Sequence, residues 1–438
     1  MTGPLETGPR WAFDTRQVHA GARPDPTTGA RATPIYQTTS FVFGDAEHAA
    51  AAFALQDLDT HAYSRLSNPT NSVVEQRIAD LENGIGAVAV ASGQAASALA
   101  LLAIARAGDH VVASSALYGG THNLFAHTFA DLGITVDFVD DPDDLGQWRE
   151  AVRPGTRALY GETIANPSGA VLDVEGVASV AHTAGVPLVV DNTVATPYLC
   201  RPLDHGADVV VHSTTKFLSG HGTGVGGIIV DSGRFDHFAD PERWPQLTAP
   251  DPSYHGLVFG TEFGELGYLM RVRTRLVRDL GPAVSPFNGF LLLHGLETLS
   301  LRMERHVANA RAIAGWLDDQ PEVTRVHYAG LPSSPWHAAA KHYLAGGAGA
   351  VLAFELAGGL AAGKRFVDAL RLFSHLANIG DVRSLVIHPA STTHAQLDED
   401  QQRAAGVTPG LVRLSVGLES ATDLIADLTT ALAATADG

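Results

Sequence analysis

Short apolar segments that alternate with longer helical stretches organise the chain between residues 73 and 230. We expect strands at 87–91, 110–114, 135–139, 157–162, 187–190, 208–212 and 226–230. We expect helices between most of them, at 94–106, 120–132, 144–152 and 174–184. Buried strands that alternate with helices are typical of an α/β fold with a mostly parallel sheet and helices on both faces.

The regions on either side of this alternation have different patterns. Residues 1–70 show little periodicity beyond a short helix near 46–55, which indicates an arm of loops, for which a partner subunit is one candidate packing surface. Residues 231–285 lose the rhythm, as in an insertion or a long connection near an active site. Beyond them we expect helices at 286–318, 361–372 and 421–434, and strands at 323–327, 350–355 and 412–416. The pattern predicts an arm (1–70), a large domain (71–290) and a smaller α+β C-terminal domain (291–438).

Composition and charge remove several classes of function. The 438 residues carry a formal net charge of −18, which disfavours a nucleic-acid or anionic-membrane partner. Cys200 is the only cysteine, so no intrachain disulfide forms and a reducing, cytoplasmic location is expected. The first 15 residues lack the features of a signal peptide, and the apolar run 98–105 is too short to span a membrane.

Lysine is scarce in this chain, and one lysine has an unusual setting. The only lysines are Lys216, Lys341 and Lys364, whereas arginine supplies almost all of the positive charge. Lys216 lies in HSTTKFLSGHG (212–222), directly after an expected buried strand. A lysine amine can form a Schiff base, which an arginine cannot do. The alternative is an ordinary surface lysine in a turn, but a buried strand and a glycine turn flank this one.

Other polar residues follow expected strands in the same region. Asp191 ends PLVVD, 25 residues before Lys216, and a carboxylate there faces the usual ligand crevice of a parallel sheet. Its alternative role is a helix cap or a loop residue. The remaining candidates are Ser92, Gly93 and Gln94 at a strand-to-helix turn, Tyr118, Asn166, and the hydroxyls of Ser213 and Thr215 before the lysine.

These residues meet the chemical demands of pyridoxal phosphate (PLP). The cofactor needs an amine, a carboxylate for its pyridine nitrogen, N–H groups and hydroxyls for its phosphate, and an aromatic face; an arginine then serves the substrate carboxylate. A glycine turn that opens a helix, such as 92–94, suits an anion. Each candidate also has an ordinary structural role, such as a Ser cap, a buried tyrosine or a turn asparagine.

Two other interpretations are rejected. Residues 222–227 match the spacing G-x-G-x-x-G, but they precede a strand instead of opening a helix, so a nicotinamide-binding site is not expected. The chain has 20 histidines, but no H-E-x-x-H and no Cys/His spacing typical of zinc. We therefore expect no metal site.

The chain resembles the Cys/Met-metabolism group of PLP enzymes, which have fold type I, over nearly its whole length. The segments that carry the resemblance are ATPIYQTTSFVF (32–43), YSRLSNPTN (63–71), ASGQAA (91–96), HSTTKF (212–217), LTAPDPSYHG (247–256), SPFNGFLLLHGLETLSLRMERH (285–306), LFSHLANIGDVRSLVIHPASTTH (372–394) and LVRLSVGLE (411–419). Together they are far more specific than any single motif.

The resemblance implies a role for each candidate. Lys216 would form the Schiff base and move protons, Asp191 would pair with the pyridine nitrogen, and Tyr118 would stack on the ring. Gly93, Gln94, Ser213 and Thr215 would hold the phosphate. It further implies a homotetramer in which Tyr63 and Arg65 reach the neighbouring active site, with Tyr63 also near the substrate. Arg413, with Ser384 nearby, would bind the substrate carboxylate; an arginine in the apolar strand LVRLSVGL needs an anion or another partner in any case.

The resemblance is strongest to the branch that acts on O-acetyl-L-homoserine, so we expect γ-replacement of acetate by sulfide or a small thiol. The alternatives within the family are O-succinylhomoserine sulfhydrylase, cystathionine γ-synthase and a γ-lyase. In the γ-lyase branch a cysteine commonly follows the stacking tyrosine, whereas Tyr118 is followed by Gly119, Gly120 and Thr121. The sequence Leu218-Ser219-Gly220 after the lysine also departs from the family pattern, but at no catalytic position. A non-catalytic binding protein on the same fold is the remote alternative.

Overall fold

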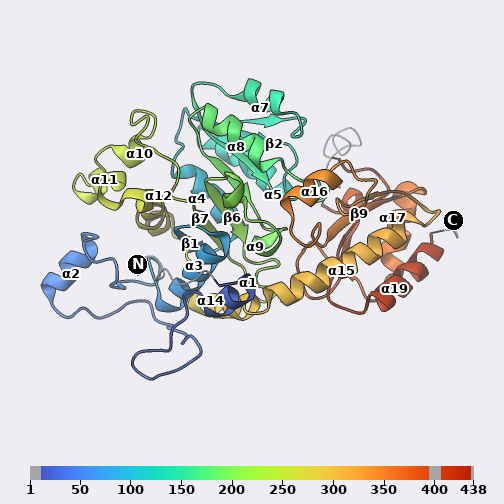
Figure 1. Cartoon of the computed structure of the whole chain (residues 1–438), viewed down its shortest axis with the longest axis horizontal. Coiled ribbons are helices and arrows are strands. Elements are labelled where there is room, and N and C mark those ends of the chain that lie inside the picture. The colour runs from blue at the N-terminus through green and yellow to red at the C-terminus, as the bar shows by residue number, and fades with distance from the viewer. Residues whose placement is uncertain (1–10, 394–405, 436–438) are drawn as a thin grey trace.

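A seven-stranded sheet forms the centre of the computed structural model, which describes residues 11–393 and 406–435 (Figure 1). The strand order is β1-β7-β6-β5-β4-β2-β3, and only β7 runs antiparallel to its neighbours. The strands are β1 Gly86–Val90, β2 His110–Ser114, β3 Thr135–Val139, β4 Thr156–Glu162, β5 Leu188–Asp191, β6 Val209–Ser213 and β7 Gly227–Asp231. The predicted, mostly parallel sheet is thereby confirmed.

Helices cover both faces of this sheet. They are α3 Pro69–Glu82, α4 Gly93–Leu102, α5 Gly119–Asn123 with its continuation to Asp131, α7 Leu145–Ala151, α8 Val174–Thr183 and α9 Thr196–Leu199. Helix α4 packs on β6 and β7, and α3 packs on β1 and β7. The predicted helix 120–132 contains one π-helical turn at Leu124–Thr128. Because β4, β5 and β6 are parallel, their carboxyl ends meet at one edge of the sheet, where Glu162, Asp191 and Ser213 lie.

Helix α3 was not predicted, although its two ends have clear sequence signals. The Asn68 side chain caps its first turn by accepting from the Thr70 N–H at 3.0 Å, and Asn83 ends it with φ of 65°. The buried residues of α3 include Asn71, Glu75 and Arg77 beside the short apolar stripe of Val74, Ile78 and Leu81. Because polar side chains occupy several of its buried positions, hydrophobic periodicity did not predict this helix.

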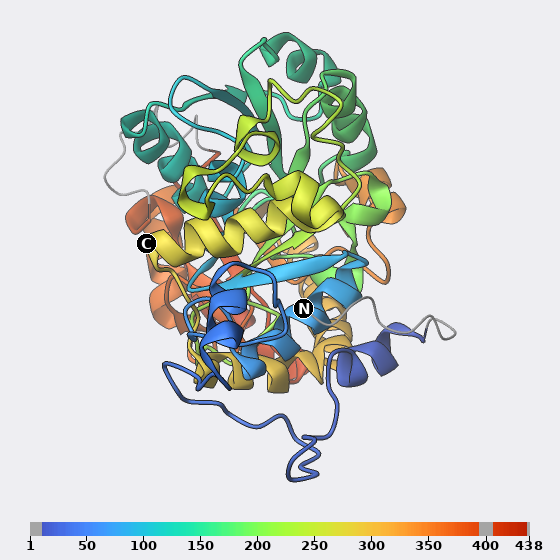
Figure 2. The ribbon, with the colours of Figure 1, turned by 90° about the vertical axis from the view of Figure 1, so that its left-hand side faces the viewer.

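The N-terminal segment contains α1 Phe13–His19 and α2 Ala46–Phe53, joined by long loops that lie at the edge of the molecule in Figures 1 and 2. Helix α2 agrees with the predicted helix near 46–55. Val42 in this segment is 99% exposed and Phe53 is 66% exposed. The predicted role of this segment as an arm toward a partner, and the domain boundaries at residues 70 and 290, stay predictions.

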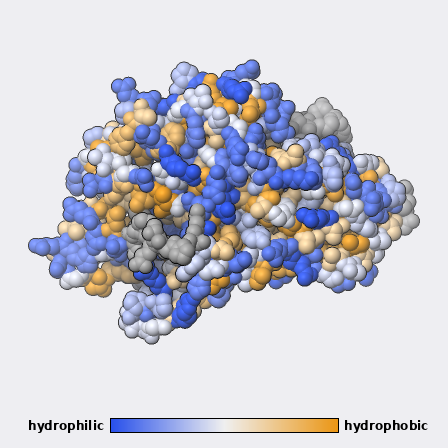
Figure 3. Space-filling view, viewed as in Figure 1, coloured by the Kyte–Doolittle hydropathy of each residue, from blue (hydrophilic) through white to orange (hydrophobic). Residues whose placement is uncertain are grey.

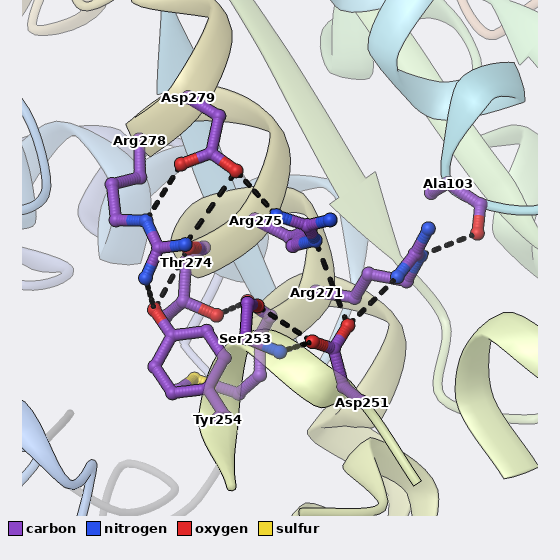
Figure 4. Close-up of polar contacts among 10 residues, drawn as sticks. Ala103, Asp251, Ser253, Tyr254, Arg271, Thr274, Arg275, Arg278 and Asp279 are labelled. Carbon is purple, nitrogen blue, oxygen red and sulfur yellow. Dashed lines mark hydrogen bonds and ion pairs between the residues drawn. The ribbon is translucent and has the colours of Figure 1, made fainter. Parts of the chain in front are cut away.

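Residues 231–285 are more helical than their sequence indicated. After α10 Pro245–Thr248 and α11 Phe259–Phe263, a continuous helical segment runs through α12 Gly267–Arg271, a π-helical stretch Val272–Val277 and α13 Arg278–Leu280. Figure 2 shows this segment in yellow across the molecule, beside β1. A polar network anchors the preceding loop to it: Asp251 lies 3.7 Å from Arg271 and 3.6 Å from Arg275 (Figure 4).

The C-terminal part holds a second sheet of five strands in the order β10-β11-β12-β9-β8. Its strands are β8 Val323–His327, β9 Val351–Leu356, β10 Ser374–His375, β11 Leu385–Ile387 and β12 Leu411–Ser415, and its helices are α16 His337–Tyr343, α17 Gly359–Ala369 and α19 Ala421–Ala433. The predicted helix 286–318 is two helices, α14 Pro286–Leu296 and α15 Leu299–Asp318, which break at Glu297 and Thr298. The long α15 connects the central region to the second sheet (Figure 1).

Hydrophilic and hydrophobic residues are intermixed over the face shown in Figure 3. Within the described ranges, no helix has the length and apolar character needed to cross a membrane.

Candidate active site

Lys216 follows the C-terminal end of β6 in a tight turn. Its backbone carbonyl accepts from the Gly220 N–H at 2.8 Å, and Phe217, which is fully buried, anchors the next position. The Lys216 amine donates to the Asn378 Oδ1 at 2.5 Å. Burial lowers the pKa of this amine, and the positive charge of Arg413 lowers it further. A lysine held in this way is more readily available as a neutral nucleophile or base than an exposed one.

Asn378 reaches Lys216 because two loops from different parts of the chain are in close contact. Gly380, with φ of 74°, lies so near the Lys216 turn that a Cβ on it would be 2.6 Å from the Phe217 nitrogen. The Val382 N–H also donates to the Gly220 carbonyl at 2.8 Å. Only glycine fits this approach, which attaches the loop before β11 to the loop after β6.

Two carboxylates lie side by side at the ends of neighbouring strands. Asp191 ends β5 and is paired in register with Glu162, which ends β4. Burial raises the pKa of both groups, and the charge of Asp191 raises that of Glu162 further. Asp191 also accepts from the Thr193 N–H at 2.9 Å and the Thr193 hydroxyl at 2.5 Å. In the described part of the chain neither carboxylate has a cation within ion-pair distance.

Tyr118 and Asn166 connect these carboxylates to an arginine. The Tyr118 N–H donates to Glu162 Oε1 at 2.6 Å, and the Asn166 N–H also bonds to Glu162. The Tyr118 ring is half exposed, and it lies over Gly120, where a Cβ would be 2.4 Å from the ring. The Asn166 Oδ1 accepts from Arg413 Nη1 at 3.3 Å. The aromatic face is therefore held beside the carboxylate pair.

Arg413 is a partly buried cation without a carboxylate partner in the described residues. It lies on β12, where its Nη2 donates to the Asn378 carbonyl at 3.0 Å and its Nε has no hydrogen-bond partner. Burial lowers the pKa of Arg413 to about 10, and the nearby Tyr118 phenol opposes this shift. A guanidinium in such a position is stabilised by a bound anion, and it presents a planar fork that suits a carboxylate.

The turn before α4 and the end of β6 form a narrow polar cradle. A Cβ on Gly93 would be 2.6 Å from the Ser213 Cβ and 2.9 Å from its Cα. The Ser92 hydroxyl caps α4 by accepting from the Ala95 N–H at 3.1 Å, and the Gln94 side chain donates to the Gly120 carbonyl at 2.8 Å. The Thr215 hydroxyl exchanges hydrogen bonds with the backbone of Gly226. A helix N-terminus flanked by hydroxyls is suited to a phosphate.

Three of the predicted residues make other contacts. The Ser384 N–H and hydroxyl both donate to Glu419, at 2.7 and 2.9 Å, so that hydroxyl has a partner within the protein. The Arg65 guanidinium lies 5.2 Å from the centre of the Tyr63 ring in the N-terminal segment. Within the described residues, no hydrogen bond or ion pair joins Tyr63 or Arg65 to the Lys216 cluster.

Sequence reasoning missed Glu162, Thr193 and Asn378. Glu162 ends a strand that was itself predicted, and a carboxylate at that place was the available signal. Thr193 follows Asp191 closely, and its hydroxyl also accepts from the Ser213 N–H at 2.8 Å. Asn378 had no local signal, because only the fold brings its loop to Lys216.

The site residues fit pyridoxal phosphate. Uncompensated carboxylates at the ends of β4 and β5 suit a protonated pyridine nitrogen, the Gly93–Ser213 cradle suits a phosphate, and Lys216 supplies the amine. The parallel sheet with its strand-end site and this donor set define a PLP-dependent enzyme.

Comparison with known proteins gives the family. The chain belongs to the Cys/Met metabolism PLP-dependent enzymes, whose family model matches residues 14–433. It is 52% identical to the O-acetyl-L-homoserine sulfhydrylase of Leptospira meyeri, with 99% of each chain covered. It is also 52% identical to the homocysteine synthase of Schizosaccharomyces pombe, over 96% of this chain and 98% of the relative. A solved Campylobacter jejuni structure described as an O-acetylhomoserine (thiol)-lyase with a pyridoxyl-lysine monophosphate superposes with a TM-score of 0.93, at 40% identity over 97% of this chain and all of that one.

Proposed function

We propose that this enzyme converts O-acetyl-L-homoserine and sulfide, or a small thiol, to L-homocysteine, or the corresponding thioether such as methionine, and acetate. In this γ-replacement the bond from Cγ to the acetate oxygen breaks, and a bond from Cγ to sulfur forms. The relatives named above, which match at about half identity over nearly the full length, support the choice of ester and nucleophile. The partly buried Arg413, which lacks a carboxylate partner in the described residues, is the single observation that supports an amino-acid substrate.

We assign a role in this reaction to each of several residues of the chain. Bound pyridoxal phosphate supplies an electron sink that stabilises negative charge on substrate carbons. Arg413 binds the substrate α-carboxylate and so orients the α-hydrogen toward Lys216. The Lys216 Nζ, whose pKa burial lowers, takes that proton and moves it between substrate carbons. Asp191, held by Thr193, would keep the pyridine nitrogen protonated, and Tyr118 would stack on the ring.

Gly93, Gln94, Ser213 and Thr215 are proposed to bind the phosphate, and Asn166 the ring hydroxyl. Ser92 supports this group by capping α4. Ser384 is proposed to act near the α-carboxylate, and its bonds to Glu419 favour a role in holding the residues before β11 against the loop after β12.

A substrate panel tests the proposed reaction. Acetyl and succinyl esters of homoserine are each offered with sulfide or cysteine, and ketoacid release is measured without any thiol. We expect the acetyl ester with sulfide to give the highest kcat/KM, and Lys216→Ala to be inactive while Lys364→Ala retains activity. A preference for the succinyl ester would favour O-succinylhomoserine sulfhydrylase, or cystathionine γ-synthase if cysteine is the better nucleophile. Ketoacid as the main product would favour a γ-lyase.

We further propose a homotetramer built from dimers that share active sites. The exposed Val42 and Phe53 support an N-terminal arm that packs on another subunit, and in the described part of the chain no hydrogen bond or ion pair joins Tyr63 or Arg65 to the Lys216 cluster. Mixing inactive Lys216→Ala with inactive Arg65→Ala subunits is expected to restore partial activity. A monomer in sedimentation, or no restoration after proven subunit exchange, would contradict this proposal.

The single, buried Cys200 supports a reducing, cytoplasmic location.

A further inference from the structure

We infer that Glu175, His205 and His342 form a binding site for a divalent transition-metal ion, with Zn²⁺ as the best match. The three side chains each offer one ligand atom, and these atoms all lie within 4.8 Å of one another. Glu175 Oε1 is 2.9 Å from His205 Nδ1, and Glu175 Oε2 is 3.3 Å from His342 Nε2. The site is separate from the Lys216 cluster and does not depend on the proposed function.

The geometry is close to what a tetrahedral ion requires. With metal–ligand bonds of roughly 2.0–2.2 Å, neighbouring ligand atoms in a tetrahedron lie about 3.3–3.5 Å apart. The separation between Glu175 Oε2 and His342 Nε2, 3.3 Å, matches that spacing, and the separation between Glu175 Oε1 and His205 Nδ1, 2.9 Å, is shorter. Because the two contacts involve different carboxylate oxygens, ion binding would require a small rotation of the Glu175 side chain. Two imidazoles and one carboxylate, with a fourth position open to water, are a donor set typical of zinc, and neutral imidazole also suits copper and nickel.

One tyrosine holds the three ligands together. The Tyr343 ring packs edge-to-face against His205, at 5.0 Å between ring centres, and against His342 at 4.5 Å. Its hydroxyl donates to Asp173, the capping residue of α8, and accepts from the Glu175 N–H at 3.3 Å. The ligand positions are therefore fixed by a shared neighbour, as second-shell residues fix the ligands of a metal site.

The ligands come from distant parts of the sequence. Glu175 is on α8 and His205 ends the short 3-10 helix Pro202–His205, both beside the central sheet, whereas His342 is on α16. The sequence has no metal-binding motif at short spacing and predicted no metal site, so only the fold reveals this one. A bound ion would attach α16 to α8 and stabilise that contact.

The alternative is a hydrogen-bonded group in which one carboxylate accepts from two histidines, without an ion. Titration of the tag-free holoenzyme with ZnCl₂, after chelator treatment and removal of the chelator, separates the two. We expect one Zn²⁺ per chain and a rise of a few degrees in the midpoint of thermal unfolding. Co²⁺ is expected to give the visible d–d absorption of a tetrahedral site, at longer wavelength than the cofactor band.

The variants assign the binding to these residues. His342→Ala alone, which removes an exposed side chain, is expected to weaken Zn²⁺ binding at least tenfold, and His205→Ala with His342→Ala to abolish it. His182→Ala is the matched control, because His182 pairs with Asp208 at 2.9 Å in a carboxylate–histidine contact without a second histidine. Retention of the PLP absorbance shows that each variant is folded. No stoichiometric binding to wild type, or undiminished binding to the double variant, would overturn the inference.

Discussion

Two polar regions of this protein differ in whether their charged side chains have partners of opposite charge. In the network of Figure 4, every arginine has an acidic partner: Arg271 and Arg275 approach Asp251, and Arg275 and Arg278 pair with Asp279. In the Lys216 cluster, the described chain offers no carboxylate to Arg413 and no cation to Asp191 or Glu162. The first region is complete by itself, whereas the second becomes complete only with ligands. Charges that satisfy each other stabilise the fold, and charges that remain unsatisfied mark the site.

The largest expected effect comes from the unpaired arginine. Arg413→Ala removes the cation that binds the carboxylate of the proposed substrate, so kcat/KM is expected to fall by about a hundredfold or more, as for loss of one partner of a buried charge pair. Arg413→Lys is expected to restore only part of this, because the planar fork is lost. Steady-state kinetics with O-acetyl-L-homoserine measure both.

Arg302 is the matched control for Arg413. It is also buried, and burial lowers its pKa to about 10, but it donates to the carbonyls of Phe217, Leu218 and Gly295. Arg302→Ala is expected to lower the midpoint of thermal unfolding of the apoenzyme clearly more than Arg413→Ala does. Equal losses of stability, with unchanged catalysis in Arg413→Ala, would contradict the comparison.

A substitution in the Asp251 network should have the opposite effect, because it should lower stability and leave activity nearly unchanged. Asp251→Ala removes two hydrogen bonds from Ser253 and two ion pairs, so the free energy of unfolding is expected to fall by about 2–3 kcal/mol. We expect kcat/KM to change by less than about threefold, a difference within the range of surface substitutions. Chemical denaturation and kinetics on the same protein measure both, with exposed Glu262→Ala as the control. A large loss of activity without a loss of stability would assign this network to the active site.

The cradle between α4 and β6 gives a smaller effect. A methyl group on Gly93 would overlap both the side chain and the backbone of Ser213, so neither can yield without a shift of the chain. Gly93→Ala is expected to weaken PLP binding by about tenfold and to cost roughly 1–3 kcal/mol of stability. Gly315→Ala is the control, because that position on α15 has open space around it. Equal PLP affinities of the two variants in equilibrium dialysis would argue against the cradle.

The smallest effect is a shift along the pH axis. Burial first, and then Arg413, lower the pKa of Lys216 from its usual 10.5, so the neutral amine persists to lower pH than in an ordinary lysine. The rate at which apoenzyme incorporates PLP should therefore rise with pH and reach its midpoint below 10.5. Arg413→Gln removes one cause of the lowering and is expected to move the midpoint upward. A midpoint that does not move would contradict the coupling of the two cations.

Local patterns predicted the central sheet and drew attention to two residues of the candidate site. Strands β2 and β3 match their predicted ranges, Asp191 ends a buried apolar segment, and Lys216 closely follows another. Helix α3 and the helix over residues 267–280 were not predicted, since polar residues occupy buried positions in both. Asn378 and the Glu175–His205–His342 group could not be found, because 162 positions separate Lys216 from Asn378 and 167 separate Glu175 from His342. The spacing of residues along the sequence does not predict such contacts.

The central claim is that Lys216 carries the cofactor. Borohydride reduction of the holoenzyme fixes lysine-bound pyridoxal phosphate as a stable adduct, and peptide mass spectrometry then locates it. The account predicts the phosphopyridoxyl group on Lys216 and none on Lys341 or Lys364. An adduct on either of those two lysines, or a catalytically active holoenzyme with an unmodified Lys216, would contradict it.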